Sequence, residues 1–169
     1  MLQLSILREL STLMESKPNI NSVLEMVLEG MYRGIGMDRT LFALRSPDHR
    51  LVSGRYALGT DNEAFCRSFR FETAAGTTSV FSRVIDDRQA VWLQEHGDGA
   101  SRTLLTAQVL GVTRGADFFV TPIEIRGKVI GLFYADRQPS GRGLDEASFS
   151  SFKHFAHQGN LALSYLSGG

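Results

Sequence analysis

The most regular pattern of apolar positions lies in residues 118–137, where two β-branched and aromatic runs flank a short turn. Gly127, in the middle of Arg126-Gly127-Lys128, can take the positive φ that a tight hairpin loop requires. Both faces of the two runs are largely apolar. The pattern therefore predicts a central β-hairpin that is covered on both sides of a sheet.

A two-residue loop would fix which residues of this hairpin share a face, because side chains alternate along each strand. Odd-numbered residues of the first run, such as Phe119 and Ile123, are then predicted to share a face with even-numbered residues of the second run, such as Leu132 and Tyr134. The other face is predicted to carry Val120, Pro122, Val129, Phe133 and Ala135.

The remaining periodicity predicts short strands between helices at both ends of the chain. Strands are expected over residues 39–45, 51–58, 69–72 and 89–93. Helices are expected over residues 2–15, 22–33, 61–67, 79–87, 103–110 and 145–166. Gly111 is predicted to end the helix before the central hairpin. The elements between residues 60 and 117 are expected to cross one face of the sheet, where loops can line a cleft.

The two terminal helices carry more apolar surface than one packing partner requires. The first has two adjoining stripes, Leu2, Ile6, Leu10 and Leu13 beside Leu4, Leu7 and Met14. The last has one long stripe, made of Phe149, Phe152, Ala156, Gly159, Leu163 and Leu166. Packing both helices on the sheet would leave Leu4, Leu7 and Tyr165 facing outward, which predicts a homodimer through these helices. A neighbouring domain of a longer protein would cover the same strip, and the sequence leaves both explanations open.

Composition narrows the classes of function. The chain has 169 residues, of which 43% are hydrophobic, and this suits one domain with a sizeable core. Lys plus Arg and Asp plus Glu number 18 each, so no net field attracts nucleic acid or an anionic membrane. No apolar run approaches the ~20 residues of a membrane span, and the N-terminus lacks signal-peptide features. One cysteine, Cys66, excludes an internal disulfide and suits the cytoplasm.

Groups suited to catalysis or metal binding are sparse. Cys66 is the one available thiol nucleophile. We favour the interpretation that it is a small, half-buried residue over the alternative that it is the nucleophile of an enzyme. His154 and His157 have i, i+3 spacing, but no third ligand follows in the sequence, so no metal site is predicted. The sequence contains no P-loop, dinucleotide fingerprint or nucleophile elbow. We therefore predict no catalytic residue and no enzymatic activity.

Residues 121–137, TPIEIRGKVIGLFYADR, resemble the end of GAF domains. Pro122, Gly127 and Ile130-Gly131-Leu132 match the family's penultimate strand, turn and last strand. Residues 19–39 are similar to its first core helix and first strand, and the resemblance covers nearly the whole chain. It implies an α+β fold, a single domain over residues 1–169, with an antiparallel sheet of about six strands and helices on both faces. The first and last helices would pack together.

The resemblance implies several functions that the residues then narrow. GAF domains include cyclic-nucleotide, bilin and haem sensors, a methionine sulfoxide reductase, and modules that only dimerise or relay signals. The reductases depend on several cysteines, and bilin-binding members commonly have His after the attachment Cys, where this chain has Arg67. The cyclic-nucleotide signature fails at Asn62-Glu63, where Lys should follow Asn, and at Gly141, where Phe should stand.

The favoured interpretation is a non-catalytic sensory or regulatory domain of a bacterial signalling protein. It would bind a small molecule or relay a signal through dimerisation, and the cofactor is not identified. A ligand-free interaction module with a filled core is the alternative. Residues 133–155 are also similar to GAF domains attached to HDOD domains, which suggests a neighbouring signalling domain.

Four residues are predicted to contact a ligand: Trp92, Phe118, Val120 and Arg70. Phe118 and Val120 lie on the penultimate strand, where family members commonly have pocket walls. Trp92 is the one tryptophan and precedes a loop, and Arg70 could meet an anion. Packing competes with ligand binding for each aromatic residue, since aromatic side chains usually lie in cores.

Overall fold

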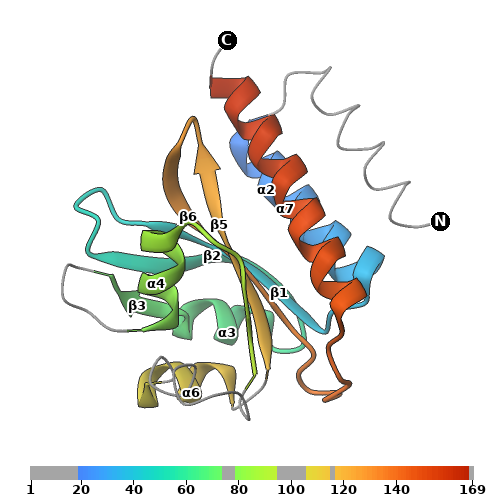
Figure 1. Cartoon of the computed structure of the whole chain (residues 1–169). Coiled ribbons are helices and arrows are strands. Elements are labelled where there is room, and N and C mark those ends of the chain that lie inside the picture. Colours follow the sequence, from blue (N-terminus) through green and yellow to red (C-terminus); the bar gives the residue numbers. More distant parts are fainter. Residues whose placement is uncertain (1–18, 74–78, 95–105, 115–116, 168–169) are drawn as a thin grey trace.

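The computed structural model describes residues 19–73, 79–94, 106–114 and 117–167. In this part of the chain, an antiparallel sheet with the strand order β3-β2-β1-β6-β5-β4 separates two layers of helices (Figure 1). The strands are β1 (Arg39–Arg45), β2 (Leu51–Gly59), β3 (Arg70–Glu72), β4 (Val91–Leu93), β5 (Phe118–Ile125) and β6 (Lys128–Asp136). The helices are α2 (Ile20–Glu29), the π-helix η1 (Gly30–Ile35), α3 (Asn62–Ser68), α4 (Val80–Asp87), α6 (Ala107–Thr113) and α7 (Glu146–Ser167).

The predicted α+β class, with six strands and helices on both faces, is confirmed for the described residues. The helix predicted over residues 2–15 and its apolar stripes lie outside them.

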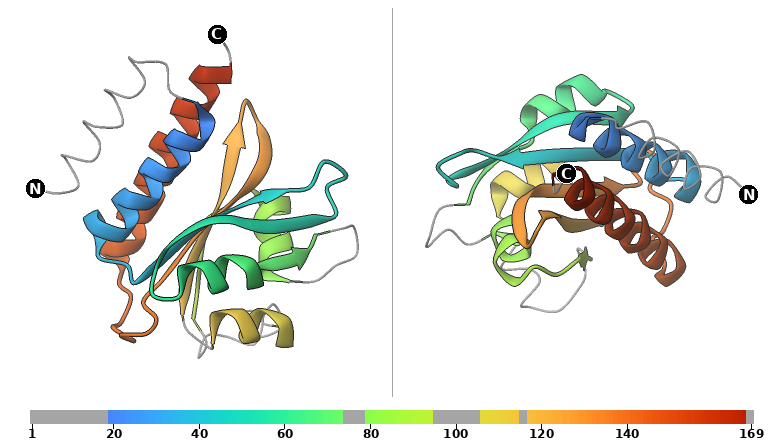
Figure 2. Two further views of the ribbon diagram at one scale, coloured as in Figure 1. Left: turned by 180° about the vertical axis from the view of Figure 1, so that it is seen from behind. Right: turned by 90° about the horizontal axis from the view of Figure 1, so that it is seen from above.

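α2, η1 and α7 cover one face of the sheet, and α2 and α7 run side by side (Figure 2). Asn19 caps α2 by accepting a hydrogen bond from the Ser22 amide, and Gly36, with a φ of 84°, ends η1. Asp145 accepts a hydrogen bond from the Ser148 amide at the start of α7. Polar side chains therefore cap the starts of α2 and α7, and a glycine ends η1.

Two contacts fix α7 in place. A Cβ atom added at Gly159 would lie 2.6 Å from Cγ2 of Val27, so the missing side chain lets α7 approach α2 closely. One residue further on, the Asn160 side chain accepts a hydrogen bond from the Glu124 amide and donates one to the Pro122 carbonyl. α7 is thus docked on both its neighbouring helix and the backbone of β5.

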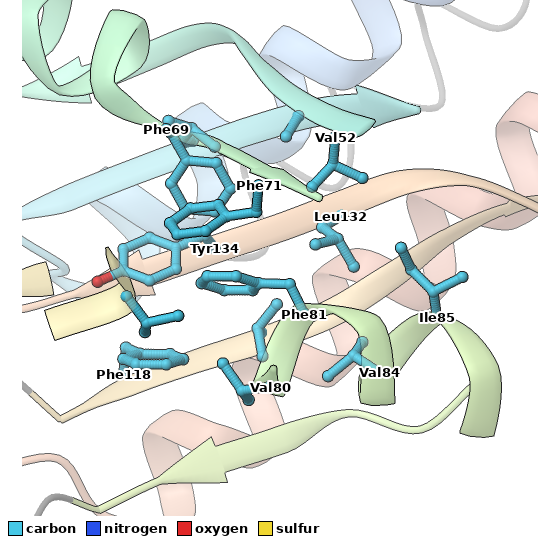
Figure 3. Packing of buried hydrophobic residues seen from close by; sticks show 14 of the residues in the cluster. Val52, Phe69, Phe71, Val80, Phe81, Val84, Ile85, Phe118, Leu132 and Tyr134 are labelled. Atoms are coloured by element: carbon cyan, nitrogen blue, oxygen red, sulfur yellow. The ribbon is translucent and has the colours of Figure 1, made fainter. Parts of the chain in front are cut away.

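The opposite face of the sheet carries α3, α4 and α6 over a core of aromatic rings. Figure 3 shows Phe69, Phe71, Phe81 and Phe118 gathered around Tyr134. Their ring centroids are 4.5–6.4 Å apart, a spacing at which aromatic pairs attract. All five residues are fully buried or nearly so. This face is therefore packed by side chains, as in the filled-core alternative.

The central hairpin turns at Arg126-Gly127, and both residues have positive φ, 53° and 80°. The two-residue loop predicted from the sequence is confirmed by the pairing of Ile125 with Lys128. Leu132 and Tyr134 pack on one face and Phe133 and Ala135 on the other, so both faces are covered, as predicted.

The predicted grouping of residues on these faces is wrong beyond the turn. Glu124 pairs with Val129, but Ile123 pairs with Gly131, so Ile130 is an extra residue that forms a β-bulge in β6. The bulge reverses the alternation: Phe119 and Ile123 share a face with Phe133 and Ala135, not with Leu132 and Tyr134.

The prediction that Gly111 ends a helix is also wrong, because α6 continues to Thr113. The Thr106 hydroxyl accepts a hydrogen bond from the Val109 amide and sets the start of the helix. Val109 and Thr113 are fully buried, and their packing holds the turn that contains Gly111.

Candidate functional site

A buried ion pair lies where β1 begins and β6 ends. Arg39 donates from Nε to Oδ1 of Asp136 at 2.9 Å and from Nη2 to Oδ2 at 2.5 Å. The Tyr134 hydroxyl donates to the same Oδ2 at 2.5 Å, and the Gln138 amide donates to Oδ1 at 3.1 Å. Four donors thus satisfy a fully buried carboxylate, which is the condition under which a buried charge is tolerated.

The surroundings favour the charged pair. Burial alone would lower the pKa of Arg39, but the hydrogen bonds and negative charge of Asp136 outweigh it, and the pKa lies above its usual value. Burial raises the pKa of Tyr134 well above its usual value, and the Asp136 charge adds to this effect. Tyr134 therefore remains a hydrogen-bond donor at neutral pH.

A cleft of about 290 Å³ opens beside this ion pair. Its lining comes from β1, the β2–α3 turn, α3, α6 and the segment after β6: Arg39, Thr60, Asp61, Ala64, Phe65, Ser68, Gly111, Val112, Arg114, Gln138 and Pro139. α3 contributes positions 61, 64, 65 and 68, which form one face of a helix at i, i+3, i+4 and i+7 spacing. We call this space the α3–α6 cleft.

Charged groups of both signs line the α3–α6 cleft. The Arg39 guanidinium stacks on the Phe65 ring, with Cζ 3.9 Å from the ring centroid. Its Nη1 makes none of the hydrogen bonds found among the described residues. Asp61 stands at the N-cap of α3, yet its side chain makes no capping hydrogen bond. Arg114 adds a second cation.

The segment 137–145 joins the α3–α6 cleft to the helical layer. Gln138 and Pro139 line the cleft, and Arg137 donates to the Ile35 carbonyl and to the Ser148 hydroxyl. Arg142 donates to the Gly36 carbonyl at 2.7 Å. One short segment therefore contacts the cleft, the end of η1 and the start of α7.

The structure does not bring together the four residues predicted to bind a ligand. Phe118 and Val120 are fully buried in the aromatic core and do not line the α3–α6 cleft. The Trp92 ring packs on Phe119 and Phe149, under α7 on the other face of the sheet. Arg70 is exposed on β3 and lies outside the cleft lining. Their ligand-binding role stays a prediction.

The candidate nucleophile and metal ligands have ordinary surroundings. Cys66 is half-buried, and burial raises the pKa of its thiol despite the nearby charge of Arg67. His154 and His157 are both exposed on α7. In the described ranges, no three His, Cys, Asp or Glu side chains gather in a way that could hold a metal ion. Among the same residues, no helical segment combines the length and hydrophobicity needed to span a bilayer.

The sequence matches no family model and no curated protein. Solved structures match over most of the chain. Residues 122–287 of a methyl-accepting chemotaxis protein superpose with a TM-score of 0.72, at 22% identity and over 96% of both chains. The GAF domain/HD domain protein from Geobacter sulfurreducens gives 0.70 at 14% identity, over 92% of this chain and 99% of that one.

The chain has the GAF fold. The phycoerythrobilin-bound GAF domain from a cyanobacterial phytochrome also superposes with a TM-score of 0.70, at 15% identity, over 98% of this chain and 96% of that one. These structures confirm the predicted resemblance to GAF domains and the predicted fold class. At such identities the likeness concerns the fold, so the function has to be argued from the residues of the site.

Sequence analysis missed the residues around which this GAF-fold site is built. Arg39, Tyr134 and Asp136 stand in apolar strands, and Asp136 is a charged residue at a position whose neighbours are buried. A charge at an inward-facing strand position requires a partner, since an unpaired buried charge is costly. That signal was present at Asp136, but its partner is 97 residues away in the chain and only the sheet pairing reveals it.

Proposed function

We propose that this GAF-fold chain is the sensory domain of a signalling protein and binds a small zwitterion or hydroxy acid in the α3–α6 cleft. Its structural neighbours include a chemotaxis protein and a bilin-bound phytochrome domain. A sensory role suits both neighbours, and this supports the proposal. The chain would act without catalysis, through binding alone.

The observation that carries the proposal is the state of Arg39. Its guanidinium is held rigidly by Asp136 and Phe65, while Nη1 remains without a hydrogen bond among the described residues. A carboxylate in the cleft would receive a charge-assisted hydrogen bond from a donor that is already positioned. Asp61, whose carboxylate does not cap α3, is suited to a ligand ammonium or hydroxyl group.

A bound ligand would act on the helices through the segment 137–145. A molecule that touches Gln138 or Pro139 would change the stability of the arrangement in which Arg137 and Arg142 hold the ends of η1 and α7. Such a ligand can shift the population of two helix arrangements only if it binds one of them more tightly than the other. The contacts of the segment 137–145 with both the cleft and the helices would make the affinity differ between the two arrangements.

Filling the cleft tests the proposal. The wild-type chain is screened by thermal unfolding against the proteinogenic amino acids, lactate, malate and citrate. We expect at least one of these probes to raise the midpoint, because a ligand that binds the folded state stabilises it. Ala64→Trp, which places an indole in the cleft, should abolish that shift. Glu63→Trp, on an exposed position of α3 outside the lining, is the matched control and should retain it.

The proposal fails if no probe stabilises the wild-type chain, or if Ala64→Trp and Glu63→Trp respond alike. The first result would favour the second candidate function, a ligand-free module that works through dimerisation. The filled aromatic core supports that candidate. So does the outward surface of α7, where Leu161 and Tyr165 are 53% and 67% exposed, one helical turn apart.

The dimerisation candidate predicts that the chain remains dimeric on dilution, with α7 at the interface. Leu161→Glu should yield folded monomers, because a buried carboxylate without a partner opposes association. Leu110→Glu is the matched control, since Leu110 is an exposed leucine on α6, away from α7. Light scattering over a concentration series measures the outcome. A wild-type monomer at every concentration, or a Leu161→Glu dimer, would contradict this interface.

A further inference from the structure

A second cleft lies at the opposite end of β1 and β6 from the α3–α6 cleft. The register places Arg39 beside Asp136 at one end of this strand pair and Leu44 beside Gly131 at the other. At that other end, the β1–β2 turn, the start of β6 and Arg88, the residue after α4, lie around one space. The space between them measures about 490 Å³ and is open to solvent. We call it the turn cleft.

The turn cleft is lined by cations and by a small apolar wall. Its lining is Arg45, Ser46, Pro47, His49, Arg88, Lys128, Val129 and Ile130. No Asp or Glu is among these described residues. Glu124 pairs with Arg88, with Oε1 4.0 Å from Nε, and Asp48 accepts hydrogen bonds from the Ser46 hydroxyl and the Arg50 amide. Positive charge therefore gathers here although the whole chain is neutral.

Arg45 is the fixed element of the turn cleft. Its Nη1 donates to the Val129 carbonyl at 3.3 Å, which holds the guanidinium against β6. Its Nε is buried and has no hydrogen-bond partner among the described residues, and Arg45 forms no ion pair there. Because Nε has almost no exposed surface, a ligand in the open cleft can meet Arg45 only through its terminal guanidinium nitrogens.

The bulge in β6 lies in the wall of the turn cleft. Ile130 is the extra residue and has no partner on β5, whereas its neighbour Val129 pairs with Glu124; both residues line the cleft. Bulges of this kind redirect side chains and backbone groups near binding sites. A Cβ atom at Gly131 would lie 2.0 Å from the Ala43 carbonyl oxygen, so a side chain at this position would force β1 and β6 apart.

We propose that the turn cleft binds a small soluble anion that carries phosphoryl groups. The planar guanidinium of Arg45 matches two phosphoryl oxygens, and Arg88 and Lys128 can neutralise further charge. Val129, Ile130 and Pro47 offer an apolar surface for an organic part of the ligand. This site is separate from the α3–α6 cleft and does not depend on what binds there.

Titration of the ¹⁵N-labelled chain with inorganic pyrophosphate at constant ionic strength tests the proposal. We expect saturable NMR shifts of the Arg45 Nε–H and of the amides of residues 45–49 and 128–130. Arg45→Gln should weaken pyrophosphate binding about tenfold, since a hydrogen bond to a charged group is lost. Lys128→Gln, at an exposed position where substitutions usually cost little stability, should weaken it as well. Citrate, a carboxylate of comparable charge, should bind more weakly than pyrophosphate.

Arg55→Gln is the matched control, because Arg55 is an exposed cation on β2 outside the turn cleft. It should leave pyrophosphate binding unchanged, and so should Ala64→Trp in the other cleft. Shifts that do not saturate, or equal weakening by Arg55→Gln and Lys128→Gln, would overturn the site. Citrate binding as tight as that of pyrophosphate would overturn the phosphoryl class. If Arg45→Gln does not fold, Lys128→Gln decides the result.

Discussion

Asp136→Ala is expected to destabilise the chain by about 3–5 kcal/mol, because the change leaves the buried Arg39 guanidinium without its counter-charge. Arg39 is only 5% exposed, so water replaces the lost carboxylate poorly. The Tyr134 hydroxyl and the Gln138 amide lose their acceptor at the same time. Chemical denaturation followed by circular dichroism measures the change in the free energy of unfolding.

Two further variants separate charge from packing in this prediction. Tyr134→Phe removes one donor to Asp136 and should cost about 1–3 kcal/mol, less than Asp136→Ala. Arg39→Met combined with Asp136→Leu removes both charges and should be less destabilising than Asp136→Ala alone, since no buried charge remains unpaired. An Asp136→Ala chain that unfolds at the wild-type midpoint would show that the ion pair is solvated rather than buried.

Phe133→Ala is expected to cost about 3–5 kcal/mol, and Leu132→Ala about 2–5 kcal/mol. Both residues are fully buried, yet they face opposite layers: Phe133 packs under α2 and α7, and Leu132 packs with the aromatic core. Each substitution leaves a cavity in a different core. Comparable losses from both variants are therefore the signature of a sheet that is covered on two sides.

The control for this pair is Tyr56→Ala, on a residue of β2 that is 36% exposed. It should cost well under the two core substitutions, since exposed positions tolerate truncation. If either Leu132→Ala or Phe133→Ala were as mild as Tyr56→Ala, the corresponding face of the sheet would have to be open to water.

The sequence was sufficient for the elements whose signals are local. The hairpin at residues 118–136 follows from two apolar runs and Gly127, and α2 follows from its cap at Asn19 and its inward stripe. Each of these depends on residues within one or two turns of chain. Periodicity and capping chemistry report such features directly.

The features that sequence analysis missed depend on contacts between distant segments. The alternation of apolar residues assumes unbroken strand pairing, so it does not reveal the bulge at Ile130. Because of this single extra residue, Leu132 and Tyr134 lie on the face opposite to the predicted one. The partnership of Arg39 with Asp136 exists only after β1 has paired with β6. Trp92 and Phe118 are both predicted to contact a ligand, but Trp92 pairs with Phe119 and packs on the opposite face of the sheet from Phe118.

The contact between Val27 and Gly159 limits how α7 can move. A slide of α7 along its axis would carry Gly159 past Val27 and bring toward Val27 a larger side chain from the same helix face one turn away, Phe155 or Leu163, where only a hydrogen atom now fits. The same slide would break both hydrogen bonds between Asn160 and β5. A piston motion of α7 along its axis is thus opposed at two points, whereas a tilt that carries α2 and α7 together preserves their packing. A domain attached beyond α7 would therefore be tilted by such a motion and would not be moved along the axis of the helix.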